Sequence, residues 1–171
     1  MRYNDILNIQ NYVSDGFVKV CDVTLQYNDW IYKNINEEIM YAQHCSWVYF
    51  IVENSRIVKC GETSKPLGIR EKQFRYKIEV QPVSNSTCRF GRLRKGDGTD
   101  AFIRNSLRYD LLNGHEVSLW AKKCPIYCLK ESINGVSKTV HTTIHKNLEI
   151  MYLDYFKSKA FCLPALNKTT K

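Results

Sequence analysis

The sequence predicts a single α/β domain of the α+β type, in which helices flank a central, mainly antiparallel sheet of three or slightly more strands. The 171 residues are 44% hydrophobic and 25% charged, which is enough apolar material for one core without disulfides. Two short apolar runs, Trp47–Val52 and Ile57–Cys60, flank a polar break and predict a tight hairpin. Segments on both sides of this hairpin carry apolar residues at helical spacing.

Charge and cysteine usage limit the kinds of partner and compartment. A net charge of +8 favours a polyanion such as nucleic acid, although solubility alone accounts for a modest excess of lysine. The seven cysteines are odd in number and scattered, which favours reduced thiols in a cytoplasm. No apolar run approaches the roughly 18 residues of a membrane span, and the polar start is not a signal peptide. We therefore expect a cytoplasmic protein with no membrane partner.

The first 45 residues predict a short helix over residues 5–13, a strand over 17–25 and a helix over 28–43. The second helix is inferred from apolar residues that recur on one face between Trp30 and Met40. We expect residues 1–45 to form an N-terminal extension of the single domain 1–171, which either packs on the core or supplies a dimer surface.

The hairpin brings chemically useful side chains together. Tyr49 and Lys59 lie ten residues apart on the two paired strands. Pro66 fits the first turn of a following helix, which carries Arg70. A phenol, an ammonium and a guanidinium could therefore converge on one surface that binds and attacks a phosphate.

A long loop follows this helix, and a second helical and sheet region completes the chain. The loop over residues 80–100 is rich in Ser, Asn and Gly and predicts either DNA contact or a solvated segment; its basic residues are Arg89, Arg92, Arg94 and Lys95. A helix over 101–113, capped by Thr99 or Asp100 and ended by Gly114, presents Arg104 and Arg108 as further DNA contacts. A strand over 116–122 is followed by residues 126–129, which continue it as a strand or form its partner, and Asn134-Gly135 marks a turn. A final helix over 138–160 carries Glu149 beside its apolar stripe.

The order of these residues resembles the GIY-YIG nucleases over residues 46–168, which we expect to form the nuclease core. The first tripeptide is Val48-Tyr49-Phe50 and the second is Lys59-Cys60-Gly61; Arg70, Glu149 and Asn167 follow in the family's order. Within that family the sequence is most similar to small type II restriction endonucleases and phage DNA endonucleases. Some of those enzymes also carry Lys where the second motif usually has Tyr.

Two departures from the family pattern concern the site. Only Tyr49 survives from the first motif and only Gly61 from the second. Phe74 stands where many members carry His or Tyr, and Tyr76 is the nearby phenol that could replace that polar helper.

The resemblance implies a role for each residue in phosphodiester hydrolysis, which needs an activated water and neutralisation of the phosphoryl charge. Tyr49 would be the general base, with Lys59 lowering its pKa from about 10. Arg70 would hold a non-bridging oxygen with its planar fork. Glu149 would ligate Mg²⁺, or Mn²⁺ in its place, because these hard cations take few carboxylates.

A second motif suggests zinc. Cys124, Cys128, His141 and His145 satisfy the spacing of a Cys₂His₂ finger. The positions that would fill the core of a finger hold Ser132 and Lys138, which disfavours structural zinc. On the predicted final helix, His141, His145 and Glu149 would share one face, which would place His145 near the catalytic metal.

Together these features predict a Mg²⁺-dependent endonuclease that cuts double-stranded DNA, with sequence specificity. Two-strand cleavage by a domain with one site favours a homodimer or a higher homo-oligomer. Its cell would be bacterial or phage-infected. The alternatives are a structure-selective repair or recombination nuclease, and a non-enzymatic, zinc-stabilised module that binds nucleic acid.

Overall fold

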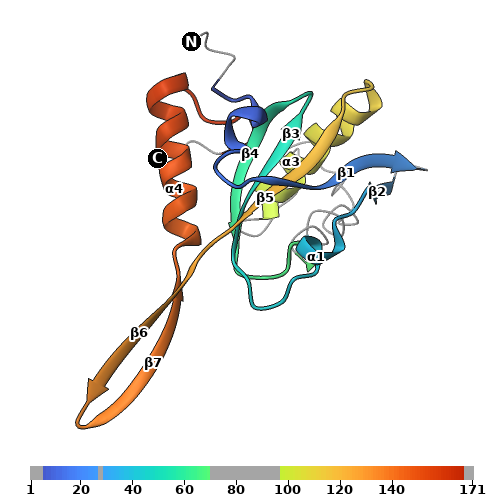
Figure 1. The fold of residues 1–171 in the computed structure, drawn as a ribbon. Coiled ribbons are helices and arrows are strands. Elements are labelled where there is room, and N and C mark those ends of the chain that lie inside the picture. Colours follow the sequence, from blue (N-terminus) through green and yellow to red (C-terminus); the bar gives the residue numbers. More distant parts are fainter. Residues whose placement is uncertain (1–5, 27–28, 70–96, 168–171) are drawn as a thin grey trace.

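A five-stranded antiparallel sheet forms the centre of the molecule, with strand order β2-β1-β5-β3-β4 (Figure 1). The computed structural model describes residues 6–26, 29–69 and 97–167. Helices α3 and α4 cover opposite faces of the sheet, because alternate residues of β3 pack against each of them. The predicted fold class, a mainly antiparallel sheet flanked by helices, is confirmed.

The predicted hairpin lies at one edge of this sheet. Strands β3 (Trp47–Glu53) and β4 (Arg56–Thr63) pair along their length with one bulge at Val58, and β3 is also paired with β5 on its other side. The turn residues Asn54 and Ser55 have φ values of 44° and 70°, as a two-residue turn between twisted strands requires. β4 is an edge strand of the sheet.

The N-terminal region joins the same sheet. It contains the 3₁₀ helix η1 (Ile9–Tyr12), strands β1 (Val18–Gln26) and β2 (Asp29–Lys33), and the short helix α1 (Glu37–Met40). The predicted helix over 28–43 is wrong, because its first half pairs with β1 as β2. The aromatic and β-branched residues Trp30, Ile31 and Tyr32 favour a strand once an edge is available to pair with. Asn36 then begins the shorter helix by accepting the Ile39 N–H with its side chain.

Residues 97–123 keep the predicted order of a helix and a strand, with a shifted helix start. Helix α3 (Asp97–Leu112) begins before the predicted caps Thr99 and Asp100, and it ends two residues before Gly114, whose φ is 80°. Strand β5 (Val117–Lys123) then inserts between β1 and β3.

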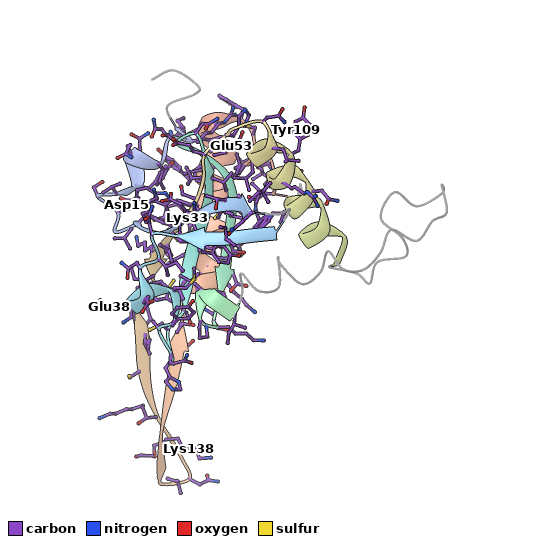
Figure 2. The ribbon with its side chains drawn as sticks, turned by 90° about the vertical axis from the view of Figure 1, so that its right-hand side faces the viewer. Asp15, Lys33, Glu38, Glu53, Tyr109 and Lys138 are labelled. Carbon is purple, nitrogen blue, oxygen red and sulfur yellow. The ribbon has the colours of Figure 1, made fainter. Side chains whose placement is uncertain are left out.

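Strands β6 (Ile126–Ile133) and β7 (Val136–Thr143) form a separate two-stranded ribbon that extends away from the sheet (Figure 1). Lys138 lies near its far end, opposite to the end of the molecule that holds Glu53 (Figure 2). The predicted helix over 138–160 is therefore wrong in its first part, and α4 spans His145–Ala160. Asn134 and Gly135, both with positive φ, close a hairpin that keeps the β-branched residues after it in a strand.

Two apolar cores lie on the two faces of the sheet. The α3 side includes Tyr49 with Ile103 and Leu107, and the α4 side includes Phe50 and Cys60 with Phe156. No helix in the described ranges is long and apolar enough to span a membrane.

Candidate active site

Tyr49 and Gly61 face each other across β3 and β4, and the tyrosine ring lies directly over the glycine. A methyl group on Gly61 would lie 2.5 Å from the Tyr49 hydroxyl oxygen and closer still to Cζ. Real carbon contacts are not this short, so only glycine allows the ring to occupy this place. The phenol therefore reaches from β3 over the edge strand, while the whole residue is only 1% exposed.

Lys59 lies two residues before Gly61 and pairs with Ile51, two residues after Tyr49. Because side chains alternate along a strand, Lys59 leaves β4 on the same face as the Tyr49 ring. Its side chain is partly exposed. The predicted convergence of the phenol and the ammonium is thus compatible with the strand register.

Asn167 binds the backbone of Cys60 on the outer edge of β4. Its Oδ1 accepts the Cys60 N–H at 2.8 Å, and its Nδ2 donates to the Cys60 carbonyl at 2.8 Å. The Leu166 N–H donates to the Val58 carbonyl, also at 2.8 Å. The asparagine that the family resemblance singled out therefore holds the strand that carries Lys59 and Gly61.

Glu149 lies on α4, which packs against the other face of β4. Burial raises the pKa of the Cys60 thiol, the Glu149 carboxylate raises it further, and the Lys59 ammonium opposes this shift. Glu149 and Lys59 are therefore both within electrostatic reach of Cys60. Tyr49 and Lys59 thus lie on one face of β4, and Glu149 belongs to the helix that packs against the other face.

His145, the first residue of α4, ties this helix to β4. Its Nε2 lies 3.1 Å from Oε2 of Glu62, and its Nδ1 lies 2.6 Å from Oγ1 of Thr143. Ser46 Oγ in turn donates to Thr143 Oγ1 at 3.2 Å. The imidazole is only 11% exposed and has both nitrogens engaged, so it fixes the end of α4 one turn before Glu149.

These contacts correct the interpretation of the histidines. His141 lies on β7 opposite Cys128, so His141, His145 and Glu149 do not share a helix face. A Cys₂His₂ finger presents both histidines from one helix, whereas here His141 lies on β7 and only His145 lies on α4. Glu62, Thr143 and Ser46 were missed at the sequence level. The alternation of side chains along the strand indicates only that Glu62 faces away from Tyr49. Its partner, His145, could not be identified because it is the first residue of α4, whose start was predicted wrongly.

Most predicted phosphate and DNA contacts lie outside the described residues. This holds for Arg70 and Tyr76 and for the whole loop set, Arg89, Arg92, Arg94 and Lys95. Arg104 belongs to α3 but its side chain is not described, whereas Arg108 is partly exposed on that helix.

A different group of side chains could hold a cation. One potential ligand atom each from Glu53, Asp110 and His115 lie within 4.8 Å of one another, and His115 Nδ1 contacts Glu53 Oε1 directly. Burial, and then the Glu53 carboxylate, raise the pKa of Asp110. Glu53 is four residues along β3 from Tyr49, a separation of about 13 Å. This cluster therefore lies apart from the surface around Tyr49.

Comparison with solved structures shows that the fold is not unique to this chain. A mutant of EndoII from bacteriophage T4 has a TM-score of 0.64 at 16% identity, over 95% of this chain and 99% of that one. The restriction endonuclease HPY188I, in complex with product DNA, has a TM-score of 0.53 at 19% identity, over 98% and 90% of the two chains. No family profile and no curated protein sequence matches. The chain therefore has a fold similar to that of phage EndoII and a restriction endonuclease.

Proposed function

We propose that this protein is an endodeoxyribonuclease that hydrolyses phosphodiester bonds in duplex DNA, with sequence specificity of the restriction or phage type. The observation that carries the proposal is the arrangement around β4: Tyr49 lies over Gly61, while Lys59 and Glu149 both reach Cys60 electrostatically. Its support from outside the site is the fold shared with a restriction endonuclease that was solved with product DNA.

Tyr49 is proposed as the general base. Its hydroxyl lies over Gly61 at the edge of the sheet, where a water poised for attack on a phosphate could donate to it. The Lys59 ammonium leaves the same face of β4 and would stabilise the phenolate that this role requires.

Glu149 is proposed as the ligand of Mg²⁺ or Mn²⁺. The residue fits that role because a single, partly exposed carboxylate suits a hard cation that keeps several waters and uses substrate phosphate as a further ligand. Bound there, the ion would polarise the phosphoryl oxygens and stabilise the leaving oxygen. The contact of His145 with Glu62 positions Glu149 by fixing the helix one turn before it.

The remaining parts of the proposal concern the substrate. Arg70 would hold a non-bridging oxygen, and the basic loop and α3 would follow the DNA backbone through the residues predicted above. Cutting both strands with one such site per chain calls for a homodimer, with residues 1–45 as a candidate interface.

Cleavage of supercoiled plasmid tests the proposal. The protein is incubated with plasmid and Mg²⁺, and the assay is repeated with EDTA and with the variants Tyr49→Phe and Glu149→Gln. Glu53→Gln is the matched control, since it removes one carboxylate charge from the other acidic group. We expect discrete fragments from the wild type and from Glu53→Gln, and none from the other three reactions. If the wild type binds DNA but does not cleave it, the proposed enzymatic activity is refuted. If only Glu53→Gln loses cleavage, the metal is held by the Glu53 group and not by Glu149.

A further inference from the structure

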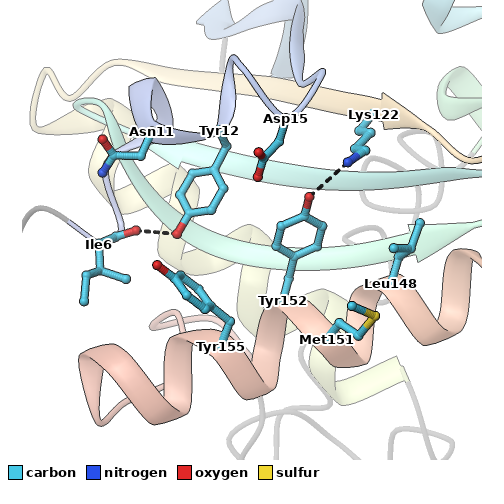
Figure 3. Close-up of a pocket in the computed structure, with 9 residues that line it drawn as sticks. All are labelled: Ile6, Asn11, Tyr12, Asp15, Lys122, Leu148, Met151, Tyr152 and Tyr155. Carbon is cyan, nitrogen blue, oxygen red and sulfur yellow. Dashed lines mark hydrogen bonds between the residues drawn. The ribbon is translucent and has the colours of Figure 1, made fainter.

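A cavity of about 620 Å³ lies on the α4 side of the sheet (Figure 3). Three parts of the chain form it: the N-terminal segment around η1, strand β5 and one side of α4. Its lining residues are Ile6, Asn11, Tyr12, Asp15, Lys122, Leu148, Met151, Tyr152 and Tyr155. This volume lies in the range that accommodates a bound small molecule of nucleotide size.

The aromatic walls of this cavity are fixed in place. The Tyr12 hydroxyl donates to the Ile6 carbonyl at 2.6 Å, and the Tyr12 and Tyr152 rings meet edge to face at 6.0 Å. Burial raises the pKa of Tyr152 to about 12 and raises that of Tyr12 as well, so both phenols are neutral at physiological pH. Tyr155 and Met151 are 42% and 64% exposed and form an open apolar rim.

Asp15 and Lys122 carry opposite charges and lie on the two sides of the Tyr152 hydroxyl (Figure 3). Lys122 donates to the Tyr152 hydroxyl at 3.3 Å, which leaves its other N–H groups for a ligand. The Asp15 side chain is exposed and makes no hydrogen bond or ion pair with any described residue. Since Asp15 is near enough to raise the pKa of Tyr152, the carboxylate and the ammonium flank the same phenol.

We propose that this cavity binds a guanine base. A flat ring would stack on the exposed Tyr155 face, as nucleobases do on aromatic side chains. Among the four DNA bases, guanine alone places two N–H donors side by side next to a carbonyl acceptor on its pairing edge. The two donors match the two oxygens of Asp15, and the acceptor matches an N–H of Lys122.

The guanine bound in this cavity could come from either of two sources: a free guanine nucleotide, or a guanine displaced from a DNA strand. Only the second source rests on the proposed function. The cavity and the candidate active site share helix α4, which carries Leu148 and Met151 of the lining as well as Glu149.

Methyl NMR on the full chain tests the proposal at the cavity itself. The sequence has three methionines, of which Met151 lines the cavity and Met40 is buried on the opposite face of the sheet. With methyl-labelled methionine and no divalent metal, dGMP should shift the Met151 signal in a saturable way and leave Met40 unchanged. We expect dGMP to bind on the order of tenfold more tightly than dAMP, dCMP or dTMP, the effect of one two-point base contact.

Three variants locate the recognition. Asp15→Asn, at an exposed position, should abolish the preference for dGMP without affecting the fold, and Lys122→Met should weaken dGMP binding. Asp154→Asn removes an exposed carboxylate from α4 that does not line the cavity, and should leave both properties unchanged. Equal binding of all four nucleotides, no shift of Met151, or equal effects of Asp15→Asn and Asp154→Asn would overturn the proposal.

Duplexes with one bulged guanine or one bulged adenine separate the two sources. If the bulged guanine shifts Met151 and dGMP competes with it, the ligand is a base in DNA; if only dGMP acts, it is the free nucleotide. Either result supports guanine binding. The titration involves no cleavage, so a protein that binds dGMP but never cuts plasmid would contradict the proposed nuclease alone. A protein that cuts plasmid without any Met151 shift would contradict the guanine site alone.

Discussion

Replacing Gly61 by alanine should destabilise the protein, although the same change inside a strand usually stabilises by about 0.5–1 kcal/mol. The reason is the Tyr49 ring, whose hydroxyl oxygen would lie 2.5 Å from the new methyl group. Forcing an extra carbon into a packed site costs about 1–3 kcal/mol. Moving the phenol by about 1 Å should also lower cleavage about 10²-fold. Urea unfolding and plasmid cleavage measure the two effects.

A double-mutant cycle isolates the contact. In a Tyr49→Leu background the ring tip is gone, so Gly61→Ala should become neutral or stabilising, which amounts to a coupling of about 1–4 kcal/mol. Tyr49→Phe is the control, because it keeps the ring and should keep the penalty. If Gly61→Ala costs the same in all three backgrounds, the ring does not lie over Gly61 and the proposed base is misplaced.

Three further outcomes follow from the contacts of β4 and α4. Glu149→Gln should lower plasmid cleavage by at least about 10²-fold while urea unfolding stays within about 0.5 kcal/mol of the wild type, because a partly exposed carboxylate is replaced by its isostere. Asn167→Ala should lower the free energy of unfolding by about 1–3 kcal/mol, since it removes two hydrogen bonds to the Cys60 backbone. A cycle of His145→Gln and Glu62→Gln should show coupling of about 0.5–3 kcal/mol in urea unfolding, and both single variants should slow cleavage.

Each of these outcomes can fail in a distinct way. Cleavage at the wild-type rate by Glu149→Gln would remove that residue from the site. An Asn167→Ala protein as stable as the wild type would mean that water replaces the side chain without loss. Additive effects of the His145 and Glu62 changes would show that α4 is positioned by other contacts.

The sequence predicted the hairpin because its signals are local. Apolar runs of strand length on both sides of Asn54-Ser55 leave few alternatives, and the turn sets the pairing of the two residue pairs next to it. A bulge at Val58 then shifts the register by one residue, which places Gly61 rather than Cys60 opposite Tyr49 and could not be predicted from the turn. The sequence also identified Gly61 as a family motif residue, but it could not show why glycine is needed there. The need arises because the Tyr49 ring on the neighbouring strand lies over this position.

The errors have a common physical cause. Trp30, Ile31 and Ile35 have helical spacing, but pairing with β1 satisfies the backbone of β2 and buries Trp30. Val136–Thr143 pairs with β6 as a ribbon, so α4 starts later than the apolar period suggests. In both regions a strand partner overrides the local pattern, and such a partner is not visible within one segment. The contact between His145 and Glu62 was unpredictable for the same reason.

Asn167 also sets the timing with which the edge of the sheet is completed during synthesis. The residue that pairs with the Cys60 backbone is made 107 positions after it. At roughly 5–20 residues per second, this side chain is synthesised about 5–20 s after Cys60, and the outer edge of β4 lacks this partner until then. During that interval its unpaired N–H and C=O groups can template another nascent chain. Expression yield should therefore fall more steeply than stability when Asn167 is replaced, and slow translation or crowded polysomes should increase the loss.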